Sequence, residues 1–285
     1  ILCAQTLKEI ITDTPFKIVV YGTPAEELLS AKYQMWENGC FRDIDVALMM
    51  HASTSTAVDS KSLAATEFAV TYHGESAHAA MFPERGKSAF DALLLAFHGT
   101  EMLREHVRDD VRLHYTCLDA GGPANIVPST AKGQFLLRSL STSYLKGLIP
   151  RFLEIIRGAS IMAGVTYSIE DSIVLPNKIP VPLLNEVIMK NARLADAPGI
   201  SLPRDRPGST DFSAVMYNIP GACLRIKFVD PPVVSHSPAF AAHGKTNDAH
   251  RAISQSAEIL AYTCADILYD ANLLKQVKQE FAENK

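Results

Sequence analysis

Hydrophobic positions in the first part of the chain follow two different spacings. Residues 4–12 and 24–38 carry apolar side chains at the intervals of an amphipathic helix. Residues 16–21 and 44–50 are short runs of β-branched, aromatic and aliphatic side chains, which are typical of buried strands. Strands that alternate with helices predict a parallel α/β layer.

The pattern changes between residues 63 and 174, where we expect two long helices among four strands. Their order, β-α-β-β-α-β, is that of the ferredoxin-like split βαβ unit. The strands are predicted at 66–72, 111–118, 134–138 and 165–174, and the helices at 88–107 and 144–162.

Further α/β signals follow this region. Helices are predicted at 183–194 and 245–269, and a strand at 223–228. The simplest architecture is one α/β domain built from residues 1–62 and 175–285, with an α+β domain inserted at 63–174. Such an insertion is physically ordinary, because lengthening an exposed loop adds little closure entropy.

Composition, charge and missing motifs exclude several classes of protein. Of the 285 residues, 47% are hydrophobic and 20% are charged, which excludes a disordered chain. The 27 Lys and Arg residues are balanced by 31 Asp and Glu without a basic stripe, so we expect no nucleic-acid partner. The sequence also lacks the phosphate-binding loop, the dinucleotide-binding glycine motif and the serine-hydrolase elbow, which argues against kinases, dehydrogenases and serine hydrolases.

Two features bear on location. The longest apolar run, at 92–97, is far shorter than the ~18 residues that a membrane span needs, so no membrane association is expected. The five cysteines are scattered and form no Cys-x-x-Cys pair, which predicts free thiols in a reducing compartment. We therefore expect a cytoplasmic protein.

Adjacent glutamates, Glu26 and Glu27, follow the first predicted strand, where ligands gather in an open α/β sheet. Capping explains this segment on its own, with Thr23 as the N-cap, Pro24 at the first helical position and Glu26 closing a capping box. Catalysis is the other interpretation, and the two roles are compatible.

Two histidines are predicted to approach the same sheet edge. His51 ends the second predicted strand, and His236 lies in a loop before the last predicted helix. A lone histidine at the position of His51 is usually a hydrogen-bonded structural residue, and His236 carries no signal without the others. Together with Glu26 and Glu27, however, they supply the ligand types that Zn²⁺ or Mn²⁺ accepts, with one carboxylate left as a base.

Three further segments carry polar groups in turns. His78 is flanked by small residues that leave its ring accessible, and the turn-rich segment around Asn125 presents an amide. Gly208, Ser209 and Thr210 precede a predicted helix start, whose free backbone N–H groups suit a carboxylate. Ordinary turn chemistry is the alternative for the segments of His78 and Asn125, and a capped helix start is the alternative for Gly208 to Thr210.

Taken in order, six segments resemble the aminoacylase/carboxypeptidase-type metallopeptidases of peptidase family M20. The resemblance covers nearly the whole chain and is nearest to the amidohydrolase and dipeptidase branch that includes the β-alanyl-lysine (Xaa-Arg) dipeptidase-like proteins. It implies an α/β zinc-exopeptidase-like catalytic domain that is split by an inserted ferredoxin-like lid and dimerisation domain. The segments are residues 22–27, 50–53, 74–80, 124–128, 208–212 and 236–238.

The resemblance also implies a chemistry, which is hydrolysis of an amide bond in dipeptides or N-acyl amino acids. In such a two-metal hydrolase, with zinc or alternatively manganese, Glu26 is the general base. Glu27, His51 and His236 are metal ligands.

The same resemblance implies partners. His78 is expected to stabilise the oxyanion in the partner subunit's site of a homodimer, and Asn125 to bind substrate. Gly208, Ser209 and Thr210 are expected to hold the substrate carboxylate.

One expected motif is missing from the sequence. The family carries a Gly-His-Ala-Cys-Gly-His-Asn-like segment with further metal ligands upstream of the paired glutamates, whereas residues 1–11 contain neither histidine nor aspartate. We expect that segment to precede Ile1 in an active enzyme. The alternative is an N-terminally truncated, catalytically silent homologue that acts as a structural or binding protein.

Overall fold

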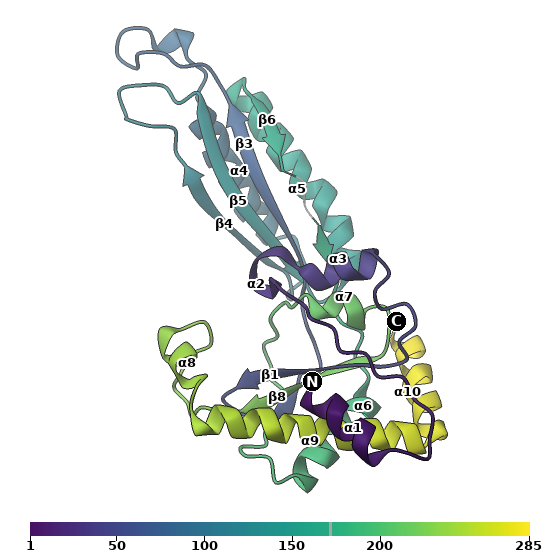
Figure 1. The fold of residues 1–285 in the computed structure, drawn as a ribbon. Helices are drawn as coiled ribbons and strands as arrows, with labels where there is room; N and C mark the ends of the chain where they lie inside the picture. The colour runs from purple at the N-terminus through teal and green to yellow at the C-terminus, as the bar shows by residue number, and fades with distance from the viewer. Residues whose placement is uncertain (171–172) are drawn as a thin grey trace. The chain divides into compact units, whose positions relative to one another are not determined.

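The chain folds into two compact units, shown in a computed structural model (Figure 1). The structure describes residues 1–170 and 173–285, apart from the side chains at 28 and 29. Unit 1 comprises residues 1–62 and 178–285, and unit 2 comprises residues 63–177.

Unit 1 contains a small mixed sheet. The strand order is β1 (Ala47–Ser53), β8 (Gly221–Lys227), β2 (Ala57–Val58), with β1 parallel and β2 antiparallel to β8. His51 of β1 is the register partner of Arg225 of β8. Because side chains at paired positions lie on the same face of a sheet, the register brings these two residues together.

Helices surround this sheet. The core of unit 1 lies where α6 and α9 pack on β8, with Leu184, Leu224 and Ile259 fully buried. The helices of the unit are α1 (Leu2–Ile10), α2 (Glu26–Leu29), α3 (Ala31–Glu37), α6 (Pro182–Leu194), α7 (Phe212–Met216), α8 (Pro238–His243), α9 (Asn247–Tyr269) and α10 (Ala271–Asn284).

Unit 2 is an antiparallel sheet with two long helices. The strand order is β4-β5-β3-β6, and β7 pairs with the other end of β3 on the β6 side. Tyr72, Phe135 and Phe152 are fully buried between the sheet and the helices. The elements are β3 (Ala64–His73), a 3₁₀ turn (Pro83–Arg85), α4 (Ala89–Arg104), β4 (Arg112–Asp119), β5 (Thr130–Ser139), α5 (Thr142–Ala163), β6 (Thr166–Ile169) and β7 (Val174–Leu175).

The predicted fold class is confirmed, and unit 2 has the strand order of a split βαβ unit. The predicted strand at 165–174 is wrong as a single element. It appears as β6 and β7, and residues 171–172 between them lie outside the described residues.

The strand predicted at 16–21 is also wrong. That segment belongs to no ladder among the described residues, and Ile18, Val19 and Val20 are 39%, 37% and 54% exposed. A β-branched run becomes a strand only where a neighbouring backbone pairs with it. Here no strand of the described chain lies in register with the segment.

The helix predicted at 24–38 is interrupted. Ser30 has a φ of 46° and separates α2 from α3, while Gly39 ends the helical region with a φ of 79°, as expected. The predicted capping box is wrong, because Ala25, with a φ of 54°, is the N-cap of α2 and makes no side-chain cap bond. His51 lies inside β1, two residues before its end, rather than at the strand end.

Among the described residues, no helix is both long and apolar enough to cross a membrane.

Candidate functional site

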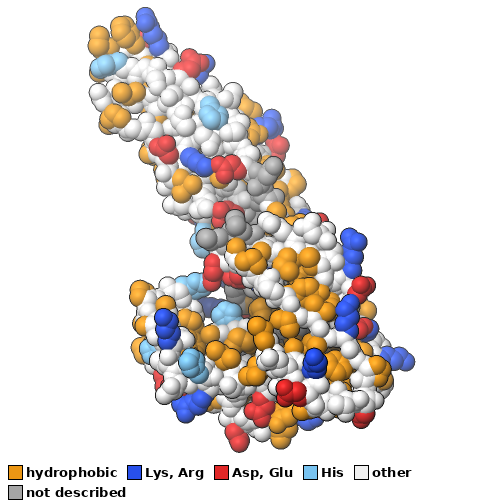
Figure 2. Space-filling model, in the orientation of Figure 1, with side chains coloured by type: hydrophobic (Ala, Val, Ile, Leu, Met, Phe, Trp, Pro, Cys, Tyr) orange, Lys and Arg blue, Asp and Glu red, His pale blue; other side chains and the backbone are white. Residues whose placement is uncertain are grey.

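Glu27 and His236 lie together in unit 1 although they are far apart in the sequence. Glu27 is in the first turn of α2, and its Oε1 lies 3.6 Å from Nδ1 of His236. Both side chains are mostly exposed, at 66% and 71%. His236 has a φ of 63°, a left-handed backbone conformation that is uncommon outside glycine. On the face drawn in Figure 2, histidine side chains gather around α8, which follows His236.

The ring of His51 is oriented by the backbone. Its Nδ1 lies 2.6 Å from the carbonyl oxygen of Ala52, so Nδ1–H donates and Nε2 stays available to another partner. This arrangement is common for metal-binding histidines, whose second nitrogen is fixed by a carbonyl or carboxylate.

The surroundings of His51 lower its pKa below the usual value. Burial of the ring lowers its pKa, and the charge of Arg225 lowers it further. The Ala52 carbonyl and the Glu26 carboxylate oppose this decrease without reversing it. A neutral imidazole at neutral pH is the form that binds a metal or accepts a proton.

Glu26 completes the group. Glu26 is half-buried at the start of α2, and its carboxylate is near enough to raise the pKa of His51. Unit 1 therefore brings Glu26, Glu27, His51 and His236 into one region, from α2, β1 and the loop before α8.

The donor types of this group suit a divalent metal, but its geometry is incomplete. Among the described residues, no three His, Cys, Asp or Glu side chains converge as a metal site would require. A catalytic zinc takes three protein ligands. The Glu27–His236 pair supplies two, so these residues fit part of a metal site.

In unit 2, the structure brings His78 and Asn125 together. The backbone N–H of Ala79 donates to the carbonyl of Asn125 (3.0 Å), and His78 forms a β-bridge with Ile126. Nδ1 of His78 accepts from the backbone N–H groups of Ala80 and Met81 at 3.3 Å. Because Nδ1 accepts, the proton of the neutral ring is on Nε2, which can donate to a ligand.

The segment Gly208 to Thr210 is anchored by its neighbour Asp211. The buried carboxylate of Asp211 forms an ion pair with Lys32 of α3 (Nζ to Oδ1, 2.7 Å) and accepts the Lys32 backbone N–H (3.0 Å). The Oγ of Ser209 is buried and has no partner among the described residues. The segment leads into α7, a helix of five residues whose N-cap, Asp211, makes no side-chain cap bond.

Sequence reasoning missed a second set of charged residues beside His51. Nε of Arg225 donates to Oδ2 of Asp59 (2.5 Å), and the guanidinium of Arg204 donates to both Asp59 oxygens (3.2 and 2.8 Å). Burial raises the pKa of Asp59, but the hydrogen bonds from both arginines outweigh it and hold the pKa below its usual value. A lone arginine within the apolar strand β8 was the only sequence signal.

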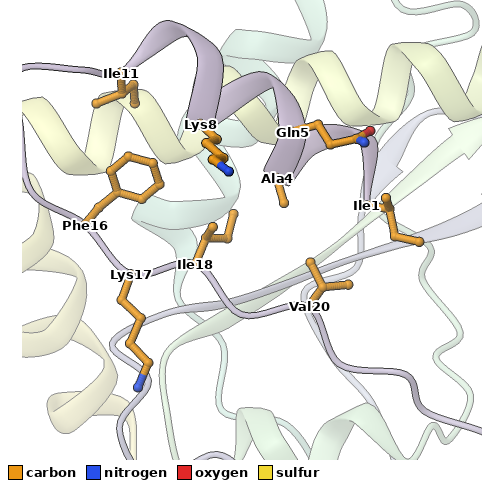
Figure 3. A pocket seen from close by; sticks show the side chains of 9 residues that line it. All are labelled: Ile1, Ala4, Gln5, Lys8, Ile11, Phe16, Lys17, Ile18 and Val20. Atoms are coloured by element: carbon orange, nitrogen blue, oxygen red, sulfur yellow. The ribbon is translucent and has the colours of Figure 1, made fainter.

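A separate cavity of about 630 Å³ lies between α1 and the extended segment that follows it (Figure 3). Its wall is apolar except for Gln5, Lys8 and Lys17, and none of the candidate site residues lines it. The cavity therefore offers no carboxylate or histidine that could act as a general base or a metal ligand.

Comparison with known proteins gives one family match and several relatives. Residues 64–160 match the model of the M20 peptidase dimerisation domain. Xaa-Arg dipeptidase of Mus musculus is 29% identical over 283 residues, which cover 96% of this chain and 64% of that protein. One of the subunits of the p-aminobenzoyl-glutamate hydrolase of Escherichia coli is 26% identical over 319 residues, covering 91% and 66%. The chain thus spans less than two thirds of the length of the dipeptidase.

Solved structures share the fold. A candidate aminohydrolase from methicillin-resistant Staphylococcus aureus has a TM-score of 0.73 at 20% identity, over 93% of this chain and 70% of that one. A Bacillus subtilis protein described as a dinuclear metal-binding peptidase of the M20 family has a TM-score of 0.62 at 15% identity, over 86% and 64%.

Proposed function

We propose that this chain is a member of the M20 peptidase family, of the amidohydrolase and dipeptidase type, and that it contributes to hydrolysis of an amide bond in dipeptides or N-acyl amino acids. One observation carries the proposal. Glu26, Glu27, His51 and His236 come from three distant segments and meet in one region of unit 1. Unit 1 is then the catalytic domain.

Glu26 acts as the general base. Its carboxylate takes a proton from the water that attacks the amide carbon, and the protonated acid then gives that proton to the departing amine. Its half-buried position beside His51 supports this role, because a base must be held near the reacting atoms while water still reaches it. Glu27, which is mostly exposed and contacts His236, takes the ligand role instead.

Glu27, His51 and His236 would hold part of a site for two divalent ions, zinc or manganese. Such ions lower the pKa of a bound water toward about 7 and polarise the carbonyl that is attacked. The backbone-fixed Nδ1 of His51, which leaves Nε2 for a ligand, supports this assignment.

Unit 2 acts as a lid and dimerisation domain. The match of residues 64–160 to a dimerisation domain supports a homodimer. His78 donates from Nε2–H to the oxyanion that forms in the site of the partner subunit, and the adjacent Asn125 binds substrate. A preorganised donor of this kind contributes about 10²–10³ to the rate.

The turn of Gly208, Ser209 and Thr210 holds the substrate carboxylate. Support comes from the Lys32–Asp211 ion pair, which fixes the end of this turn against α3. The turn's donors are then positioned before substrate arrives, which reduces the entropy lost on binding.

A catalytically silent homologue is the second candidate function. The observation that favours it is the absence, among the described residues, of three converging metal ligands. In that case the chain keeps the fold and the dimerisation unit and binds acylated amino acids without cleaving them.

Substitution of Glu26 by Gln in the intact protein tests the proposal. Glu26→Gln keeps the shape of the side chain but removes the base, so we expect kcat to fall by at least about 10²-fold while metal content is unchanged. Glu37→Gln, an exposed residue at the end of α3, is the matched control and keeps normal turnover. Normal turnover by Glu26→Gln removes Glu26 from the base role, and no turnover in the unmodified protein supports the silent homologue.

A further inference from the structure

Two arginines share one carboxylate next to the candidate site. The guanidinium groups of Arg204 and Arg225 both bind Asp59, and among the described residues no other acidic side chain pairs with either of them. The group formed by Asp59, Arg204 and Arg225 therefore carries one positive charge in excess. We refer to these three residues as the arginine cluster.

The arginine cluster is only partly open to solvent. The side chains of Arg225 and Asp59 are 13% and 12% exposed, and that of Arg204 is 45% exposed. An uncompensated charge costs more as water is removed from around it. A partly buried excess of positive charge is therefore better stabilised by an anion than by the protein alone.

Both arginines keep hydrogen-bond donors in reserve. Arg225 uses Nε on Asp59 and directs one terminal nitrogen toward Nδ1 of His51, and Arg204 uses Nε and one terminal nitrogen on Asp59. The second terminal nitrogen of each guanidinium has no acceptor among the described residues, and neither nitrogen is among the buried atoms that lack a partner. Donors that are reached by solvent and held in a fixed plane match the two oxygens of a carboxylate.

The position of the cluster connects it to the candidate site. Arg225 is the register partner of His51 on the adjacent parallel strand, and its terminal nitrogen lies 3.3 Å from Nδ1 of His51. Asp59, which fixes Arg225 in place, follows the neighbouring strand β2. An anion on the cluster would therefore lie beside a substrate that reaches His51.

We propose that Arg225 and Arg204 bind the side-chain carboxylate of the substrate, so that the preferred substrates are amides of acidic amino acids rather than of neutral or basic ones. This inference rests on the proposed function, whose site it extends. Asp59 is the positioning residue, because it holds both guanidinium groups without neutralising both charges.

The test compares N-acetyl-glutamate with N-acetyl-glutamine in the intact protein. The two compounds differ only in the charge and donors of the side chain, and a charge-assisted hydrogen bond supports a preference of about 10- to 100-fold in kcat/KM. Arg225→Gln, and separately the more exposed Arg204→Gln, should reduce this ratio at least about tenfold. Arg206→Gln, an exposed arginine two residues further on, is the matched control and should keep the ratio.

Binding of N-acetyl-glutamate, measured by calorimetry on the same proteins, distinguishes carboxylate binding by the arginine cluster from the proposed amide hydrolysis. If Arg225→Gln loses binding and the parent protein shows no turnover, carboxylate binding by the arginine cluster is supported and the proposed hydrolysis is refuted. Turnover with equal kcat/KM for both compounds supports the hydrolysis and refutes recognition of the side-chain carboxylate by the arginine cluster. An equal loss for both compounds in Arg225→Gln also overturns it, because the arginine would then bind the α-carboxylate that they share.

Discussion

Removal of one partner of the buried Lys32–Asp211 ion pair is expected to destabilise unit 1 strongly, whereas replacement of both partners should cost much less. Their side chains are 7% and 0% exposed, so neither charge can be solvated if its partner is removed. Asp211→Asn leaves the Lys32 ammonium without a counter-charge, and the expected cost is about 3–5 kcal/mol of the free energy of unfolding. The double variant Lys32→Met/Asp211→Asn should recover much of this loss, because it no longer buries an unpaired charge.

Fluorescence of Trp36 provides a local assay. Trp36 is the single tryptophan of this sequence, lies on α3 one turn after Lys32, and packs in the cluster that contains Phe212 and Met216 of α7. Urea unfolding followed at this residue therefore reports on the contact that the ion pair joins. The control is Asp45→Asn, which removes the exposed partner of Lys278 and should cost under about 1 kcal/mol.

If Asp211→Asn lowers the free energy of unfolding no more than Asp45→Asn does, the penalty for an unpaired buried charge at this site is refuted. It is refuted equally if the double variant is less stable than Asp211→Asn alone, because the loss would then come from packing rather than from an unpaired charge.

Three other predictions can be measured on the same protein. His78→Ala should lower kcat by about 10²-fold with unchanged metal content, and loss of metal instead would make His78 a ligand. His236→Ala should reduce metal content. An unchanged metal content would show that His236, which contacts Glu27, is not a metal ligand. Burial lowers the pKa of Lys178 to about 8, so the folded state binds fewer protons than the unfolded state between pH 8 and 10.5. Stability should therefore rise across that window relative to Lys178→Met, by an amount of the order of 3 kcal/mol, and parallel curves for the two proteins would contradict the shift.

Elements with a strong local pattern were predictable from the sequence. The helix predicted at 144–162 is α5 (Thr142–Ala163), and the strand predicted at 66–72 is β3 (Ala64–His73). Each of them carries its burial pattern within its own residues, so periodicity alone identifies it.

Features that depend on distant partners were not predictable. The run at 16–21 has strand composition but no strand beside it among the described residues, and the left-handed φ of Ser30 has no glycine to signal it. The arginine cluster joins Asp59 to residues more than a hundred positions away. Such pairs leave no local pattern. The paired glutamates and His51 were singled out from expected strand ends, although residues 16–21 form no strand among the described residues and His51 lies within β1.

Metal content and hydrolysis, measured together on one chelator-free preparation of the intact protein, decide whether the protein is a metal-dependent amide hydrolase. We expect about two divalent ions per chain, turnover of an N-acyl amino acid or dipeptide, and loss of turnover with retained metal in Glu26→Gln. An intact protein that binds no metal and cleaves no amide would contradict this expectation and identify a silent homologue.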